Sequence, residues 1–90
     1  MRILEKEIDV ICICNKGKPP KPCRFKLSYS DGTVRTIEVD NIVLTEKFLP
    51  GGSTYYLYHC ASEVNGSIVE YELKYFVRDI KWQLYRTVNV

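Results

Sequence analysis

Two turn pairs, Asp31-Gly32 and Asn65-Gly66, lie within long runs in which apolar and polar residues alternate. Period-two alternation is typical of a strand with one buried face, and an Asx-Gly pair supplies the positive φ angles of a tight hairpin turn. No segment of useful length has the period of an amphipathic helix. These features favour an all-β fold.

The run from 55 to 77 predicts a hairpin about Asn65-Gly66 in the plain two-residue register. In that register His59 lies opposite Glu72 and Leu57 opposite Lys74 on an outer face. A last reversal at 78–79 brings residues 81–87 back beside the hairpin. The pairs expected on the inner face are Cys60–Tyr71, Tyr58–Leu73, Tyr56–Tyr75, Tyr75–Trp82 and Leu73–Leu84.

The register of the hairpin about Asp31-Gly32 depends on the face on which it places the carboxylate of Glu38. A plain turn would place Glu38 opposite Phe25 in the interior, and a buried, unpaired carboxylate is costly. A shift by one residue places Val39 there instead and requires a bulge at residues 34–35. The outer pairs expected from that shift are Lys26–Glu38 and Arg24–Asp40.

Together with the alternating run at 7–14, these segments predict six short, mainly antiparallel strands. Residues 15–22, with three prolines, predict an exposed loop, and Pro-Gly-Gly marks a second loop over 45–54, with one helical turn at most. Strands of this spacing indicate a small SH3-like or OB-like barrel. We expect one domain over residues 1–90.

Composition narrows the classes of function. With 46% hydrophobic residues and a net charge of +2, the chain is globular and lacks the strong positive field of dedicated nucleic-acid binders. The N-terminal residues show no apolar signal-peptide core, and no apolar run is long enough to cross a bilayer. We therefore expect a cytoplasmic protein without a membrane partner.

Three of the four cysteines, Cys12, Cys14 and Cys23, flank the proline loop, and Cys60 lies in a later strand. Zinc sites prefer two to four residues between paired cysteines, whereas Cys12 and Cys14 are separated by one. A disulfide from Cys12 or Cys14 to Cys23 is conceivable but does not suit a reducing cytosol. We interpret all four as core thiols and predict no metal site and no cofactor.

His59 is the sole histidine, so acid–base chemistry would fall to it, oriented by Glu72, or to a carboxylate. We interpret this pair as an exposed cross-strand His–Glu contact. The Gly17-Lys18 step lacks the other residues of a phosphate-binding loop. We expect no enzymatic activity, no catalytic residue and no evident small-molecule substrate.

Two surfaces are candidates for binding. The first is a basic segment without an acidic residue, which suits weak nucleic-acid binding or an acidic protein partner; its residues are Lys16, Lys18, Lys21, Arg24 and Lys26. The second is a set of apolar residues on the outer side of the strands, which suits a protein partner or a homo-oligomer; its residues are Ile11, Ile13, Tyr55, Leu57, Phe76 and Tyr85.

The segments EIDVICICNKG and YELKYFVRDIKWQLYR resemble those of small uncharacterised bacterial all-β proteins of about this length. The resemblance extends over most of the chain and implies no activity and no site residues. The sequence thus favours a non-enzymatic interaction module that binds protein or itself, with weak nucleic-acid binding through residues 16–26 as the alternative.

Overall fold

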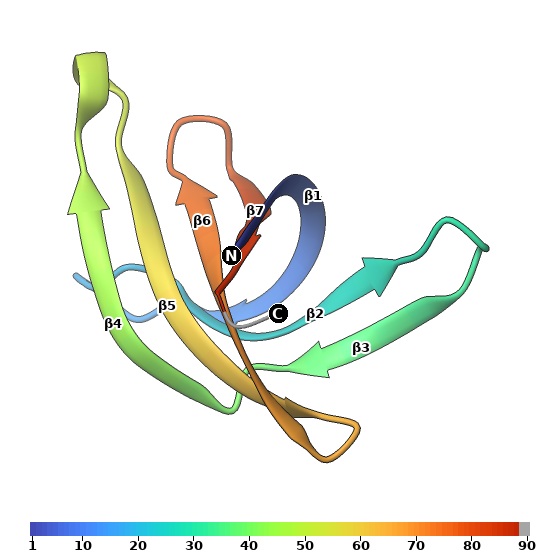
Figure 1. Cartoon of the computed structure of the whole chain (residues 1–90). Helices are drawn as coiled ribbons and strands as arrows, with labels where there is room; N and C mark the ends of the chain where they lie inside the picture. The colour runs from blue at the N-terminus through green and yellow to red at the C-terminus, as the bar shows by residue number, and fades with distance from the viewer. Residues whose placement is uncertain (89–90) are drawn as a thin grey trace.

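One antiparallel sheet of seven strands makes up the structure, a computed structural model that describes residues 1–88 (Figure 1). The order of the strands across the sheet is β3-β2-β1-β7-β6-β5-β4. A single 3₁₀ turn, η1, lies between β4 and β5. The elements are β1 (Arg2–Ile13), β2 (Lys21–Ser28), β3 (Val34–Glu38), β4 (Asn41–Phe48), η1 (Pro50–Gly52), β5 (Tyr55–Val64), β6 (Ser67–Phe76) and β7 (Lys81–Thr87).

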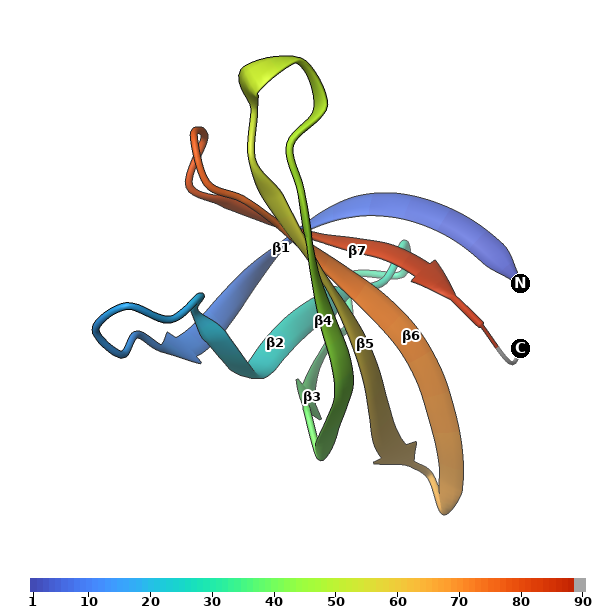
Figure 2. The same ribbon diagram turned by 90° about the vertical axis from the view of Figure 1, so that its left-hand side faces the viewer.

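The sheet curls because β1 bends. Its first half pairs with β7 and its second half with β2, and the register shifts once in each ladder, between Ile3 and Lys6 and between Ile11 and Cys12. Glu5, inside the first shift, has a φ of 47°. Bulges of this kind add twist to a strand, and the strongly twisted strands cross one another in side view (Figure 2).

The prediction of an all-β, antiparallel, curved fold is confirmed, but the expected six strands and closed barrel are wrong. The sheet is a half-barrel whose edges, β3 and β4, share no ladder among the described residues. The corner between them is held against β5 instead. The Ser62 hydroxyl donates to the Glu38 carbonyl, and the Asp40 carboxylate accepts the Glu63 amide at 2.8 Å.

The seventh strand is β4, which covers part of the predicted 45–54 loop. Thr45, Glu46 and Lys47 pair with β5 as a strand, so a helical turn at this point is wrong. The conformation of this segment is determined by its pairing with β5, and the local sequence does not predict that pairing. Only Pro50–Gly52 behaves as the turn that its residues predict.

The predicted bulged register of β2 and β3 is also wrong. Phe25 lies opposite Ile37, not Val39, and no shift occurs in this ladder. The turn is a three-residue loop, in which the Thr33 carbonyl accepts the Tyr29 amide at 2.8 Å and Gly32 takes a φ of 88°. Compared with the predicted bulged register, this loop moves the partner of Phe25 by two residues, from Val39 to Ile37. Glu38 therefore stays on the outer face without a bulge in the strand. On the outer face Glu38 therefore faces Arg24 rather than Lys26, and Asp40 does not pair with Arg24.

The β5–β6 register is as predicted, and the β6–β7 register is as predicted from Leu73 to Phe76 but shifts between Glu72 and Leu73. Asn65 and Gly66 have φ angles of 52° and 78°, as a type I′ turn requires. The inner-face pairs expected from the sequence are all present, among them Cys60–Tyr71, Tyr58–Leu73 and Tyr75–Trp82.

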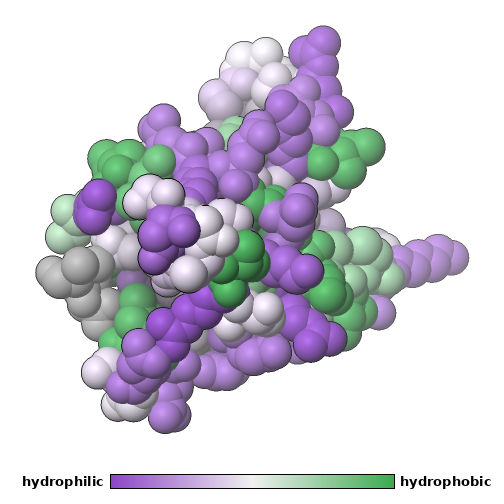
Figure 3. Space-filling model, turned by 90° about the vertical axis from the view of Figure 1, so that its right-hand side faces the viewer, coloured by the Kyte–Doolittle hydropathy of each residue, from purple (hydrophilic) through white to green (hydrophobic). Residues whose placement is uncertain are grey.

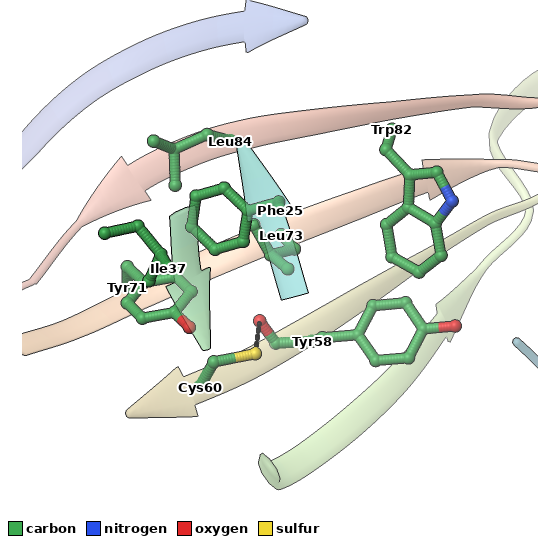
Figure 4. Close-up of a cluster of buried hydrophobic side chains, with 8 residues drawn as sticks. All are labelled: Phe25, Ile37, Tyr58, Cys60, Tyr71, Leu73, Trp82 and Leu84. Atoms are coloured by element: carbon green, nitrogen blue, oxygen red, sulfur yellow. Dashed lines mark hydrogen bonds between the residues drawn. The ribbon is translucent and has the colours of Figure 1, made fainter. Parts of the chain in front are cut away.

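The core lies on the inner face of the half-barrel, where the β2–β3 hairpin packs over β5, β6 and β7 (Figure 4). Phe25 meets Tyr71 edge-on at 5.6 Å between ring centroids, and Trp82 packs against Tyr58 at 5.3 Å. Leu73 has no exposed surface. These aromatic rings supply large buried areas from few residues. The buried hydrophobic residues are Phe25, Ile37, Tyr58, Cys60, Tyr71, Leu73, Trp82 and Leu84.

Among the described residues, no helix is long and apolar enough to cross a membrane.

Candidate interaction surfaces

The outer face of the sheet, opposite the core, carries a cluster of aromatic rings. The register of β4, β5 and β6 places Phe48, Tyr55 and Phe76 side by side on neighbouring strands. The rings of Phe48 and Tyr55 are stacked at 5.0 Å, and those of Tyr55 and Phe76 lie 5.8 Å apart. All three side chains are half-buried. An antiparallel sheet normally presents polar residues on its solvent face, so this cluster is a departure from that pattern.

Lys74 joins a fourth ring to this group. Its ammonium lies 4.8 Å from the ring centroid of Tyr55 and 3.7 Å from that of Tyr85. Contacts of a cation with ring faces hold an aliphatic lysine stem flat against the surface. Beside it, Leu57 is buried. We call these residues the outer aromatic cluster: Phe48, Tyr55, Leu57, Lys74, Phe76 and Tyr85.

A row of charged side chains crosses the same face next to the cluster. The His59 Nδ1 lies 2.9 Å from Glu72 Oε2, and its Nε2 lies 2.6 Å from Glu46 Oε1. Glu72 is almost fully buried and is also bound by Arg86, whose Nη2 donates to Oε2 at 2.9 Å. Hydrogen bonding to Glu72 raises the pKa of Arg86.

This row has the geometry of a structural network. Both ring nitrogens of His59 contact carboxylates, so neither is directed at a neighbouring nucleophile. The expected His59–Glu72 contact is present. It is part-buried rather than exposed, because Glu46 and Arg86 extend it across four strands.

A groove of about 850 Å³ lies where β1 leaves β7 and joins β2. Its apolar lining comes from β1, β6 and β7 and includes Ile8, Val10, Tyr75 and Trp82. Lys6, Lys26 and Lys81 add positive charge, and Glu7 and Asp9 add negative charge. The lining of the groove is therefore about as polar as it is apolar.

The proline loop forms one end of this groove. The Tyr58 hydroxyl donates to the Pro20 carbonyl at 2.5 Å, which fixes the end of the loop against β5. Burial raises the pKa of Tyr58 above its ordinary value. Cys12, Cys14 and Pro20 line the groove at this end.

The structure divides the predicted basic segment. Lys16, Lys18 and Lys21 are exposed in the loop and at the start of β2. Arg24 contacts Glu38 at 3.7 Å on the outer face, and Lys26 lies on the same face of β2, opposite Asp9 of β1. The five cations are therefore divided between the loop with the start of β2 and the outer face of β2.

The predicted apolar interface is divided as well. Tyr55, Leu57, Phe76 and Tyr85 come together in the outer aromatic cluster. Ile11 and Ile13 are exposed near the end of β1, where they pair with β2 and not with the cluster. From the side of the β2–β3 turn, hydrophobic residues form separate patches among hydrophilic ones (Figure 3).

The cysteines differ in burial, so the prediction that all four are core residues is only partly correct. Cys60 is buried, Cys12 and Cys23 are half-buried, and Cys14 is exposed because β1 ends at Ile13. Burial raises the pKa of Cys60 to about 12. Burial and a hydrogen bond with Cys14 raise the pKa of Cys12. All four thiols are free, and within residues 1–88 no group of three or more His, Cys, Asp and Glu side chains is arranged to hold a metal ion.

Sequence reasoning missed the groove and three outer-face residues, Phe48, Glu46 and Arg86. The first two lie on β4, which was predicted as a loop. Arg86 faces Glu72 because the β6–β7 ladder shifts between Glu72 and Leu73, and regular alternation does not anticipate this shift. The β-branched residues Ile42, Val43 and Thr45 were the signal that could have identified β4.

Comparisons with protein-family models, curated proteins and solved structures found no match to this chain.

Proposed function

We propose that the protein is a non-enzymatic, cytoplasmic binding module, and that two copies associate through the outer aromatic cluster. The observation that carries this proposal is the position of Phe48, Tyr55 and Phe76 on the solvent face of an open sheet. Apolar groups that are partly exposed on a solvent face and rimmed by polar residues mark protein interaction sites. From the SH3-like or OB-like prediction we keep only the expectation that a small curved sheet presents a binding surface.

A second copy is the occupant that fits this face. A twofold interface brings the same patch of both copies together, so the patch must complement itself. Lys74 supplies a cation within the cluster, and Glu46, beside it, is a carboxylate with 41% of its side chain exposed. The cluster also reaches β4, an edge strand with unpaired backbone groups. The overall charge of +2 opposes association only weakly.

Sedimentation equilibrium over a range of concentrations tests the pairing. We expect a reversible dimer, and we expect Tyr55→Ser with Phe76→Ser to shift it to monomer because the ring contacts are lost. Val34→Ser is the matched control, since it removes an exposed apolar side chain from β3, at the opposite edge of the sheet. A wild-type protein that stays monomeric at all concentrations contradicts self-association.

The absence of catalysis is tested separately. The engagement of both His59 nitrogens by carboxylates supports this part of the proposal. Turnover of an ester, phosphoester or peptide substrate that disappears in His59→Ala would contradict it.

Nucleic-acid binding through Lys16, Lys18, Lys21, Arg24 and Lys26 stays the weaker alternative. Stacking platforms need exposed aromatic rings; Phe25 is buried, and Tyr29 is exposed but lies in the β2–β3 turn, beyond the basic segment. Binding to single-stranded RNA that weakens steeply between low and physiological salt would support this alternative.

A further inference from the structure

We propose that Cys12 and Cys14 form a thiol–disulfide exchange site, which takes a low-molecular-weight disulfide as its oxidant and closes a reversible bond between the two cysteines. The site lies at the end of β1, on the inner side of the sheet. Neither residue belongs to the outer aromatic cluster, so this inference is independent of self-association.

The end of β1 brings the two thiols to one face. Cys12 lies opposite Pro22, which is fully buried, and packs against the core, so its side chain lies on the inner face. Side chains two residues apart along a strand share a face, and both cysteines line the same end of the groove. A hydrogen bond joins the two thiols. The two sulfur atoms are therefore neighbours in the reduced protein.

The two thiols differ in their access to solvent. Cys14 follows Ile13, the last residue of β1, and is exposed, whereas Cys12 is half-buried. Among thiols, an exposed one is the more readily oxidised. Cys14 is therefore the attacking thiol, and Cys12 beside it is the resolving thiol.

The reaction balances in two exchange steps. The Cys14 thiolate attacks one sulfur of glutathione disulfide, forms a mixed disulfide and releases a glutathione thiolate. The Cys12 thiolate then attacks Sγ of Cys14, closes the internal bond and releases the second glutathione thiolate. The two cysteines lose two electrons, which reduce the oxidant, and their two protons are taken up by the released glutathione thiolates.

The residues around the site suit an anionic oxidant. Lys16, Lys18 and Lys21 are exposed in the loop that follows Cys14 and at the start of β2. Residues 10–30 contain no Asp or Glu. Positive charge near a site raises the local concentration of an anion, and glutathione disulfide is one.

The spacing of the two cysteines makes the bond reversible. At a rise of about 3.3 Å per residue, α-carbons two positions apart in a strand are separated by about 6.6 Å, near the upper limit for a disulfide. Closure therefore needs a shift of Cys14, which lies outside the β1–β2 ladder. A disulfide formed under strain is easily reduced. This property suits the transient disulfides of a reducing cytosol.

The other two thiols have different contacts. Cys60 is buried, and its thiol donates to the Tyr58 carbonyl at 3.6 Å. Cys23 lies at the bulge of β2, between the residues that pair with Ile11 and Cys12, and its thiol donates to the Lys21 carbonyl at 3.7 Å. Cys23 is therefore the matched control for the two cysteines of the site.

Tryptic peptides distinguish the possible bonds. Cys12 and Cys14 fall in one peptide, residues 7–16. Cys23 falls in the next, residues 17–24, because trypsin does not cleave before proline. The folded protein is equilibrated in glutathione buffers of increasing oxidised fraction, free thiols are blocked with N-ethylmaleimide, and the digest is analysed by mass spectrometry.

We expect peptide 7–16 to lose two hydrogens and escape blocking in the oxidised buffers, and to regain both thiols with dithiothreitol. Circular dichroism in the same buffers should stay unchanged, since the bond forms in the folded protein. Blocking of both cysteines at every ratio, or a bridge between peptides 7–16 and 17–24, would overturn the proposal.

Single variants test the order of the two steps. Cys12→Ser should accumulate the mixed disulfide, seen as one glutathione on Cys14. Cys14→Ser should lose the reaction of this peptide with glutathione disulfide. Cys23→Ser should close the internal bond at the same glutathione ratio as the wild type. Glutathione that stays on Cys14 of the wild type, or loss of the bond in Cys23→Ser, would contradict the assignment.

Discussion

Glu72 lies opposite Arg86 in the β6–β7 ladder, and the guanidinium contacts both oxygens of its carboxylate. Because Glu72 is almost fully buried, loss of Arg86 leaves its charge with His59 alone. We expect Arg86→Met to lower the free energy of unfolding strongly, and the double variant with Glu72→Gln to recover part of the loss. Urea unfolding of four proteins, the wild type, the two single variants and the double variant, measures this coupling. The control is Arg24→Met, which breaks the exposed contact with Glu38 and should change the free energy of unfolding little. If Arg24→Met lowered the free energy of unfolding as much as Arg86→Met, the special role of Glu72 would be contradicted.

Leu73 tests the position of the core. It has no exposed surface and lies at the centre of the inner face. Leu73→Ala should lower the free energy of unfolding by about 2–5 kcal/mol, because it removes buried methyl groups and leaves a cavity. Val43→Ala, at a site that is 69% exposed on β4, should change it by less than about 0.5 kcal/mol. Chemical denaturation gives both values, and similar losses would place the core elsewhere.

Gly32 tests the backbone conformation of the β2–β3 turn. Its φ of 88° closes the three-residue loop, and a side chain is strained there although nothing lies within 4 Å of an added Cβ. We expect Gly32→Ala to destabilise the protein by about 1–2 kcal/mol. Gly32→Asn should be milder, because asparagine tolerates positive φ better than alanine. Equal stability of wild type and Gly32→Ala in thermal unfolding would be inconsistent with this turn.

Alkaline pH should destabilise the fold. Burial raises the pKa of Cys60 from 9.0 to about 12, and burial also raises that of Tyr71. Above pH 9 the unfolded chain loses the Cys60 proton while the folded chain keeps it, so stability falls as pH rises, by about 1.4 kcal/mol per pH unit for one such group. This loss continues until the folded thiol ionises near pH 12. The free energy of unfolding, measured from pH 8 to 10.5, should fall less steeply in Cys60→Ala than in wild type; identical slopes would show that this thiol titrates normally.

The regular hairpins of this fold could be predicted because the turn residues that set each register lie between the two strands in the sequence. Asn65-Gly66 fixes a type I′ turn, and every pair of the β5–β6 ladder follows from that turn by counting. At Asp31-Gly32 the same counting failed. There the Asp31 carboxylate accepts the amide and hydroxyl of Thr33, which stabilises a longer loop. The predicted faces were nevertheless correct, with Phe25 on the inner face and Glu38 on the outer face. Burial, and not the turn, determines which face each of these residues takes.

What could not be predicted depends on irregular pairing between distant strands. The bulges of β1 bend the sheet and create the groove, yet no residue type marks them in the sequence. Four of the six residues of the predicted outer surface came together and two did not, and the bend of β1 separates the two groups. Tyr55 and Phe76 face each other across one regular ladder, whereas Ile11 lies beyond the bend.

The central position of β1 has a consequence for the path of folding. Hairpins such as β5–β6 join neighbouring segments, so they close short loops and can form early. The ladder between β1 and β7 joins the two ends of the seven-strand sequence and requires a loop that contains all the other strands. We expect it to form late, after the four strands β4 to β7 have assembled on one side and the β2–β3 hairpin on the other. The first strand of the sequence is then the last to gain both of its neighbours, and until it does so β7 is a bare edge that another unfinished chain can pair with.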